Sequence, residues 1–211
     1  MLLDRRAFRS SAYIAANGQG FTERALRLGR VAATAPLAAV LRKTNPAQAS
    51  RIVYLSFRGM SEDRVAVLGQ EYFNEILRPK IRPEALGLIE RFRNDGHRVV
   101  LISELISEVV TPLLEYLKEP DQLVSNALEF RNGKATGRLK PPVLGGTATR
   151  KWLERFSSDE KIDLKHSTAC AAYNTDRPLL RGVGSPFIVN PDLILRQSAR
   201  ESRWPELSLA R

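Results

Sequence analysis

A serine at the end of a predicted buried strand is the residue of this chain best suited to chemistry. Residues 83–96 have the pattern of a helix that starts with proline and ends in an Asn-Asp-Gly turn. Residues 99–102 are apolar without alternation, which is typical of a strand covered on both faces, and Ser103 follows them. Residues 104–117 have a helical pattern, so we expect Ser103 at a strand-to-helix turn, where free backbone amides favour an anion. Open α/β sheets bind their ligands at this end of their strands.

Several segments, in chain order, resemble the phosphoserine-phosphatase-like branch of the haloacid-dehalogenase (HAD) superfamily. Besides the helix, strand and serine above, the segments are LEFRNGKATGRLKPP, AYNTDRPLLRGVGSPFIVNPD and ARESRWPEL. The resemblance runs from about Ser50 to Leu207. It implies an α/β fold in which a Rossmann-like core with a mostly parallel sheet carries a small helical cap. It also implies Mg²⁺-dependent hydrolysis of phosphomonoesters through an aspartyl-phosphate.

The same resemblance assigns roles to individual residues. In such phosphatases a Ser or Thr and a Lys hold the phosphoryl oxygens, and acidic residues hold Mg²⁺. Ser103 matches the phosphate-binding serine, whereas Ala148 stands at the lysine position. Arg150 or Lys151 takes the place of that lysine only if the alignment of this turn with the family's motif is shifted along the sequence. Asp176 matches one acidic metal ligand, and the earlier carboxylate of the same motif is missing.

The family's first motif, an Asp-x-Asp at the end of a central strand, is also absent. One of its carboxylates attacks phosphorus and the other acts as general acid and base. Residues 1–8 resemble the segment that follows this motif, and no Asp-x-Asp follows an apolar run before Ser50. Without the first strand, two buried strand edges would lack backbone partners. We therefore expect either that the true start lies upstream of Met1 or that another segment or partner fills the gap.

Three functions follow from this pattern. The main hypothesis is a catalytically defective HAD protein that acts in binding or regulation, because the nucleophile, the lysine and the main metal ligand are all missing. The first alternative is an active phosphomonoester phosphatase whose first motif lies upstream of a mis-assigned start. In both cases the expected ligand is a phosphorylated small molecule, with Mg²⁺ implied only by the resemblance, and a protein partner is a further possibility.

The second alternative is a basic scaffold that binds nucleic acid or an acidic membrane. The net charge of +10 and the pI near 10.2 favour anionic partners. The arginines are spread along the chain, however, and only Arg24, Arg27 and Arg30 share one helix side. This spread favours a solvated surface over a dedicated nucleic-acid site.

The predicted organisation is a helical cap region over residues 1–77 and an α/β core over residues 78–211. Breaks at Asn45-Pro46 and near Ser61 divide the cap into helices, and Asn132-Gly133 predicts a hairpin turn in the core. Further expected core elements are a short strand over 121–126, a helix over 149–156, strands over 168–173 and 186–190, and a helix from Pro191 to Ser202.

The cysteine count and the apolar segments indicate in which cellular compartment the protein is expected. Cys170 is the single cysteine of the 211 residues, so no internal disulfide forms, and we expect it to be a buried core thiol. The apolar run over 31–41 contains a proline and is too short to span a bilayer. The opening lacks the basic-then-apolar layout of a secretory signal. These features predict a cytoplasmic protein.

Overall fold

The computed structural model describes residues 7–18, 20–117 and 122–207. The helices are α1 Ala7–Ala16, α2 Phe21–Thr44, α3 Pro46–Val53, α4 Glu62–Tyr72, α5 Pro83–Asn94, α6 Ser107–Val110, α7 Pro112–Tyr116, α8 Thr147–Asp159, α9 Arg177–Leu180 and α10 Leu193–Ser202. The strands are β1 Val100–Ile106, β2 Gln122–Arg131, β3 Lys134–Lys140, β4 Thr168–Ala171, β5 Ser185–Val189 and β6 Glu206–Leu207. The fold is therefore mixed α/β with parallel strands, as the sequence predicts.

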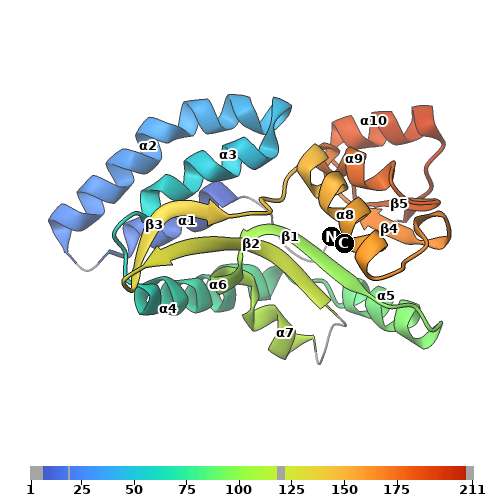
Figure 1. The fold of residues 1–211 in the computed structure, drawn as a ribbon, viewed down its shortest axis with the longest axis horizontal. Helices are drawn as coiled ribbons and strands as arrows, with labels where there is room; N and C mark the ends of the chain where they lie inside the picture. Colours follow the sequence, from blue (N-terminus) through green and yellow to red (C-terminus); the bar gives the residue numbers. More distant parts are fainter. Residues whose placement is uncertain (1–6, 19, 118–121, 208–211) are drawn as a thin grey trace.

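The strands form two separate sheets (Figure 1). In the first sheet, ordered β1-β2-β3, β1 pairs with β2 in parallel and β2 pairs with β3 antiparallel. In the second sheet, ordered β4-β5-β6, both pairings are parallel. β1 and β4 are thus the outer strands of their sheets.

The elements of the core largely match the predicted ones. The turn between β2 and β3 is the predicted hairpin: Asn132 and Gly133 both have positive φ, 49° and 68°, as a tight two-residue turn requires. The predicted short strand over 121–126 is part of the longer β2, and Asp121 lies outside the described residues. The helices predicted over 149–156 and from Pro191 correspond to α8 and α10.

The prediction for the segment after Ile102 was wrong. β1 continues through Ser103 to Ile106, and the helix begins only at Ser107. Leu105 and Ile106 are fully buried, so their side chains favour continuation of the strand over an exposed helical turn. Ser103 therefore lies within the strand and not at the first turn of a helix.

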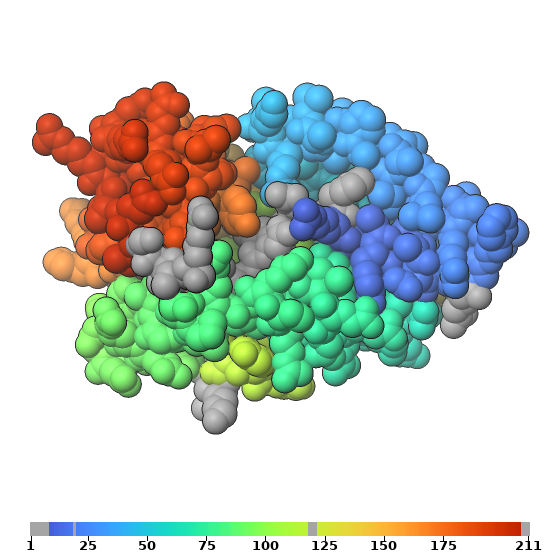
Figure 2. Space-filling view, turned by 180° about the vertical axis from the view of Figure 1, so that it is seen from behind, coloured from blue at the N-terminus to red at the C-terminus, as the bar shows by residue number. Residues whose placement is uncertain are grey.

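Buried apolar side chains form two clusters. The larger cluster joins the cap helices to the first sheet, and includes Tyr54, Phe57, Leu68, Leu105 and Leu128. The smaller cluster consists of Ala171, Leu180, Ile188, Leu195 and Ala199, from the second sheet and its helices. In Figure 2 the orange and red elements of the second cluster and the blue helices α1 and α2 form two lobes on a green base. The boundary between cap and core after residue 77 stays a prediction.

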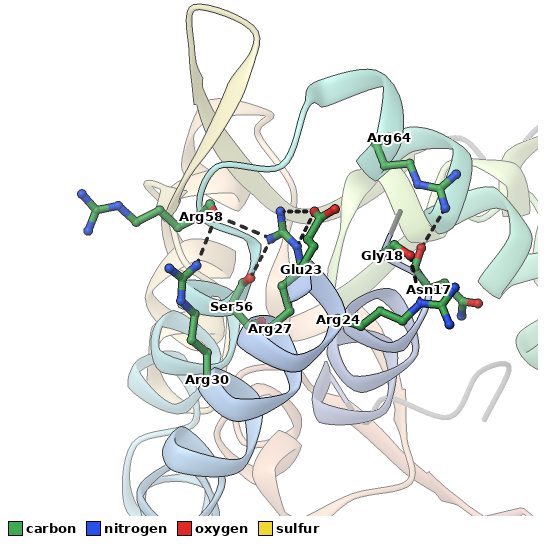
Figure 3. Close-up of polar contacts among 9 residues, drawn as sticks. All are labelled: Asn17, Gly18, Glu23, Arg24, Arg27, Arg30, Ser56, Arg58 and Arg64. Carbon is green, nitrogen blue, oxygen red and sulfur yellow. Dashed lines mark hydrogen bonds and ion pairs between the residues drawn. The ribbon is translucent and has the colours of Figure 1, made fainter. Parts of the chain in front are cut away.

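Arginines of α2 bind backbone carbonyls of the protein itself (Figure 3). The guanidinium of Arg27 is buried, pairs with Glu23 at 2.7 Å and donates to the carbonyl oxygen of Ser56 at 3.1 Å. Arg24 donates to the carbonyl of Gly18, and Arg30 donates to that of Arg58. The three arginines are engaged with carbonyls of the protein itself, and the burial of Arg27 removes its charge from the exposed surface of α2. None of the described helices combines the length and the apolarity needed to cross a lipid bilayer.

We predict that Arg27→Met destabilises the fold much more than Arg30→Met. Loss of Arg27 leaves the buried Ser56 carbonyl without this donor, which costs about 2 kcal/mol, whereas the more exposed Arg30 contact is worth less than about 0.5 kcal/mol. Urea unfolding of the two variants measures the difference in the free energy of unfolding. Equal losses would contradict the anchoring role of Arg27.

Candidate functional site

A cavity of about 370 Å³ lies between β1 and β4. Its walls come from both outer strands and from two longer helices, α5 and α8. The apolar side chains that these helices contribute are Ala85, Leu88, Ile89, Phe92, Leu153 and Phe156. The cavity also separates the two apolar clusters, because β1 belongs to the larger one and β4 to the smaller one.

Contacts at the two ends of α8 fix the relative direction of β1 and β4. Arg98, just before β1, pairs with Glu160, just after α8, at 2.9 Å. Farther along β1, the Asn126 side chain donates a hydrogen bond to the Glu104 carbonyl and accepts one from the Leu144 N–H. Leu144 lies shortly before α8. Helix α8 therefore runs antiparallel to β1 and returns the chain to the starting end of β4. It follows that β1 and β4 run in the same direction and that their carboxyl ends meet at one end of the cavity.

Ser103 is the central residue of β1 and directly follows Ile102, where the regular pairing with β2 ends. It lines the cavity, is 9% exposed, and its Oγ accepts a hydrogen bond from the backbone N–H of Leu105 at 3.2 Å. The pairing of β1 with β2 is irregular between Ile102 and Ile106, so the strand bends here. The bend and the short local bond hold the hydroxyl at the cavity end of the strand.

Asn126 anchors the site, although the sequence analysis did not single it out. Its side chain is fully buried, donates from Nδ2 to the Glu104 carbonyl at 2.7 Å and accepts at Oδ1 from the Leu144 N–H at 2.7 Å. It thus ties β1, β2 and the loop after β3 together. The available sequence signal was an amide side chain directly before the apolar Ala127 and Leu128, since a buried amide needs fixed partners.

Thr149 is a second residue that the sequence analysis missed. It is buried, lines the cavity, and its Oγ1 accepts from the Gly145 N–H at 2.8 Å. Gly145 has φ of +148°, and a Cβ at this position would lie 2.6 Å from the Ala47 backbone nitrogen. The loop before α8 therefore packs closely on the start of α3, which only glycine allows.

The structure brings together some of the predicted site residues and separates the others. Asp176 lines the same cavity as Ser103 and is 8% exposed. Arg150 instead donates from Nε to Glu154 at 2.7 Å, and Lys151 is exposed on α8. Neither basic residue belongs to the cavity wall. Their use in place of the family's lysine stays a prediction.

Two carboxylates belong to the cavity wall. Glu104 and Asp176 are the acidic residues of its wall. Across the described parts of the chain, no three His, Cys, Asp or Glu side chains come close enough to hold a metal ion. Magnesium in proteins is usually bound by one or two carboxylates together with substrate phosphates and waters, so the assignment of Asp176 as a Mg²⁺ ligand stays a prediction.

Cys170 lies on β4 in the same wall. Burial raises the pKa of its thiol from 9.0 to about 11. The thiolate is the reactive form, so an elevated pKa makes this cysteine slow to react near neutral pH. Cys170 is half-buried and not a fully buried core thiol as expected, and only its low reactivity follows from the raised pKa.

We predict that alkylation of Cys170 by iodoacetamide at pH 8 is about a hundredfold slower than that of an exposed thiol. Because its folded-state pKa is raised, the rate should climb with pH until about 11, and not level off near 9. Mass spectrometry of timed samples measures this rate. The matched control is the double variant Cys170→Ser, Ser158→Cys, whose thiol is exposed on α8, and equal rates would contradict the buried placement.

Comparison with known proteins places these observations in a family. The family model described as haloacid dehalogenase-like hydrolase matches residues 8–181. The chain is 31% identical over 154 residues to the "Inhibition of morphological differentiation protein" of Streptomyces azureus, covering 73% of this chain and 55% of the relative. It is 32% identical over 162 residues to "Phosphoserine phosphatase SerB1" of Mycobacterium tuberculosis, covering 76% of this chain and 52% of that protein.

The fold also resembles that of solved structures. A substrate-bound phosphoserine phosphatase complex matches with a TM-score of 0.70 and 18% identity, over 100% of this chain and 89% of that one. At this identity the likeness concerns the fold. The chain spans about half the length of the two sequence relatives.

Proposed function

This chain belongs to the haloacid dehalogenase-like hydrolase family, in its phosphoserine-phosphatase-like branch, and we propose that it binds a phosphate ester without hydrolysing it. The proposed site is the part of the cavity wall where Ser103 of β1 and Thr149 of the first turn of α8 lie. The ligand would be a phosphorylated small molecule. Since one relative is named as a phosphoserine phosphatase, phosphoserine is the first compound to test.

One observation carries this proposal: within the part of the chain that the structure describes, the space between β1 and β4 is a cavity, and no strand lies in it. An aspartyl-phosphate needs a carboxylate aimed at phosphorus from a rigid element. Of the two acidic residues in the wall, Glu104 belongs to β1 itself and Asp176 to the short helical turn before α9. Neither occupies a strand between β1 and β4.

The groups that remain can hold an anion. Two buried hydroxyls, those of Ser103 and Thr149, border the same end of the cavity. Hydrogen bonds to a charged group are roughly twice as strong as those between neutral groups. The net charge of +10 further attracts anions over longer distances. The Glu104 carboxylate opposes this attraction, so we expect modest affinity.

The remaining assignments complete the proposal. Residues 1–77 would serve as the cap that selects the ligand, and residues 78–211 as the core that holds its phosphate. Asp176 would hold Mg²⁺ if the family's cofactor binds here, and we assign no step to that ion. The cytoplasmic location stays a prediction.

A second candidate is an active phosphatase whose first motif lies upstream of Met1. The cavity between β1 and β4 favours it, because both strands present an outer edge there. It requires in-frame codons upstream that encode an apolar strand ending in Asp-x-Asp. A stop codon in place of such a segment would end this candidate.

We predict that Ser103→Ala weakens phosphoserine binding by about tenfold, because it removes a hydrogen bond to a charged ligand worth about 1.5 kcal/mol. Isothermal titration calorimetry on the 211-residue protein measures the affinity. The matched control is Ser158→Ala, since Ser158 is exposed on α8 and outside the cavity wall. Its affinity should equal that of the unaltered protein.

The same preparation should show no Mg²⁺-dependent hydrolysis of p-nitrophenyl phosphate above background. Turnover that disappears in Asp176→Asn would overturn the non-hydrolytic proposal. Equal binding by Ser103→Ala and Ser158→Ala would overturn the assignment of the anion site.

A further inference from the structure

We propose that the outer side of α2 binds the surface of an anionic lipid bilayer, with the helix axis parallel to the plane of the bilayer. The surface consists of the exposed side chains of α2 from Phe21 to Lys43, and we name it the α2 face. It belongs to the cap helices and is separate from the cavity between β1 and β4. The inference therefore does not rest on the proposed binding of a phosphate ester.

One side of α2 is packed and the other is open. Arg27, Val31 and Ala38 are buried, and the helix packs on α1 and α3. In Figure 1, α2 runs along the outer margin of the molecule, with α3 on its inner side. A large apolar patch that stays open in a folded protein marks a contact with another protein or a membrane. The large apolar side chains of the open side, which are between 42% and 86% exposed, are Phe21, Leu26, Leu28, Leu37 and Val40.

The middle of the α2 face carries no charge. Between Arg24 and Lys43, every exposed residue of α2 is Ala, Leu, Gly, Pro or Val. This uncharged stretch from Ala25 to Val40 is about 23 Å long at the rise of about 1.5 Å per residue. The solvent side of a surface helix normally carries charged and polar residues instead. The α2 face is therefore suited to the boundary between the lipid headgroups and the acyl chains.

Positive charges border this stretch at both ends. Arg24 lies near the start of α2, and Arg42 and Lys43 lie in its last turn. The backbone carbonyl to which Arg24 donates is neutral, so the positive charge of this side chain remains. Glu23 is the single acidic residue of α2, and it pairs with Arg27. An apolar helix side bordered by cations is the pattern of a helix that lies in the interface of an acidic membrane.

The charges argue against a second copy of this chain as the occupant of the α2 face. An antiparallel pair of α2 helices would place Arg24 of one copy beside Lys43 of the other. A parallel pair would place each cation beside its own counterpart. Both arrangements bring like charges together, and the net charge of +10 adds to the repulsion. An anionic bilayer instead offers negative charge at both ends of the helix.

The packing of α2 sets how the helix meets the bilayer. Because Val31 and Ala38 are buried against the protein, lipid cannot surround the helix. Only the open side can insert, to a depth of roughly 5–10 Å into the boundary between headgroups and acyl chains. The long side chains of Arg24 and Lys43 can then keep their charges among the headgroups while their aliphatic parts lie along the apolar surface.

The first test is cosedimentation of the 211-residue protein with vesicles of phosphatidylcholine, with or without about one third phosphatidylserine. We expect binding to the anionic vesicles and about tenfold weaker binding to the neutral ones, because several cations lose their lipid partners. The double variant Leu37→Gln, Val40→Gln changes no charge and should weaken binding about tenfold through lost apolar contact. The matched control is Leu193→Gln, a leucine of α10 that is 80% exposed, and it should bind like the unaltered protein.

A fluorescent label locates the contact on the molecule. The variant Val40→Cys, made together with Cys170→Ser, carries an environment-sensitive dye at a single position. Its matched control is Leu193→Cys in the same background, since both positions expose a large apolar side chain. Anionic vesicles should shift the emission of the dye at position 40 to shorter wavelength and leave that at position 193 unchanged. Removal of one cation by Lys43→Gln should weaken vesicle binding about fivefold.

Three results would overturn the proposal. The first is equal binding to anionic and neutral vesicles, or binding to neither. The second is unchanged binding by Leu37→Gln, Val40→Gln, which assigns the attraction to the basic surface alone. The third is a dimer of the free protein that this double variant converts to a monomer in analytical ultracentrifugation, which assigns the α2 face to a second copy. None of these measurements involves phosphoserine, so the proposed phosphate site succeeds or fails separately.

Discussion

Backbone pairing of buried parallel strands is the constraint on which this structure depends. A parallel strand covered by helices has no water to satisfy its amides and carbonyls, so it needs a neighbour on each edge. Within the described chain, β1 and β4 each have a neighbour on one edge only, and the cavity lies between their outer edges. The division of the apolar core into two clusters follows from the same interruption.

The two halves hold their arrangement through contacts that do not involve this missing pairing. The cap helices and the first sheet share one core, and the buried Arg27 ties α2 to the segment after α3. The smaller half is linked to the first sheet along α8, by Arg98 with Glu160 at one end and by the Asn126 bonds at the other. A helix anchored at both ends can keep two sheet edges facing each other.

Much of this architecture could be predicted from the sequence, because local patterns determine it. Backbone preferences of a few residues determine three of its elements. These are the helix from Pro83, the Asn132-Gly133 turn and the apolar first part of β1. The continuation of β1 to Ile106 could not be predicted in this way, since burial of Leu105 and Ile106 depends on distant elements. The inward direction of Arg27 and the roles of Asn126 and Thr149 likewise depend on carbonyls and amides far away in sequence.

Ser103 and Asn126 each have a structural role that does not require catalysis. The Ser103 hydroxyl satisfies the Leu105 amide where β1 bends, and Asn126 satisfies groups of both β1 and the loop before α8. Removing either side chain would leave buried backbone groups without partners, which is costly in any folded protein. Ser103 and Asn126 therefore have roles in the fold that are separate from the proposed binding of a phosphate. Fold and chemistry separate here because packing is spread over many residues, whereas covalent phosphoryl transfer depends on one strand and its terminal side chains.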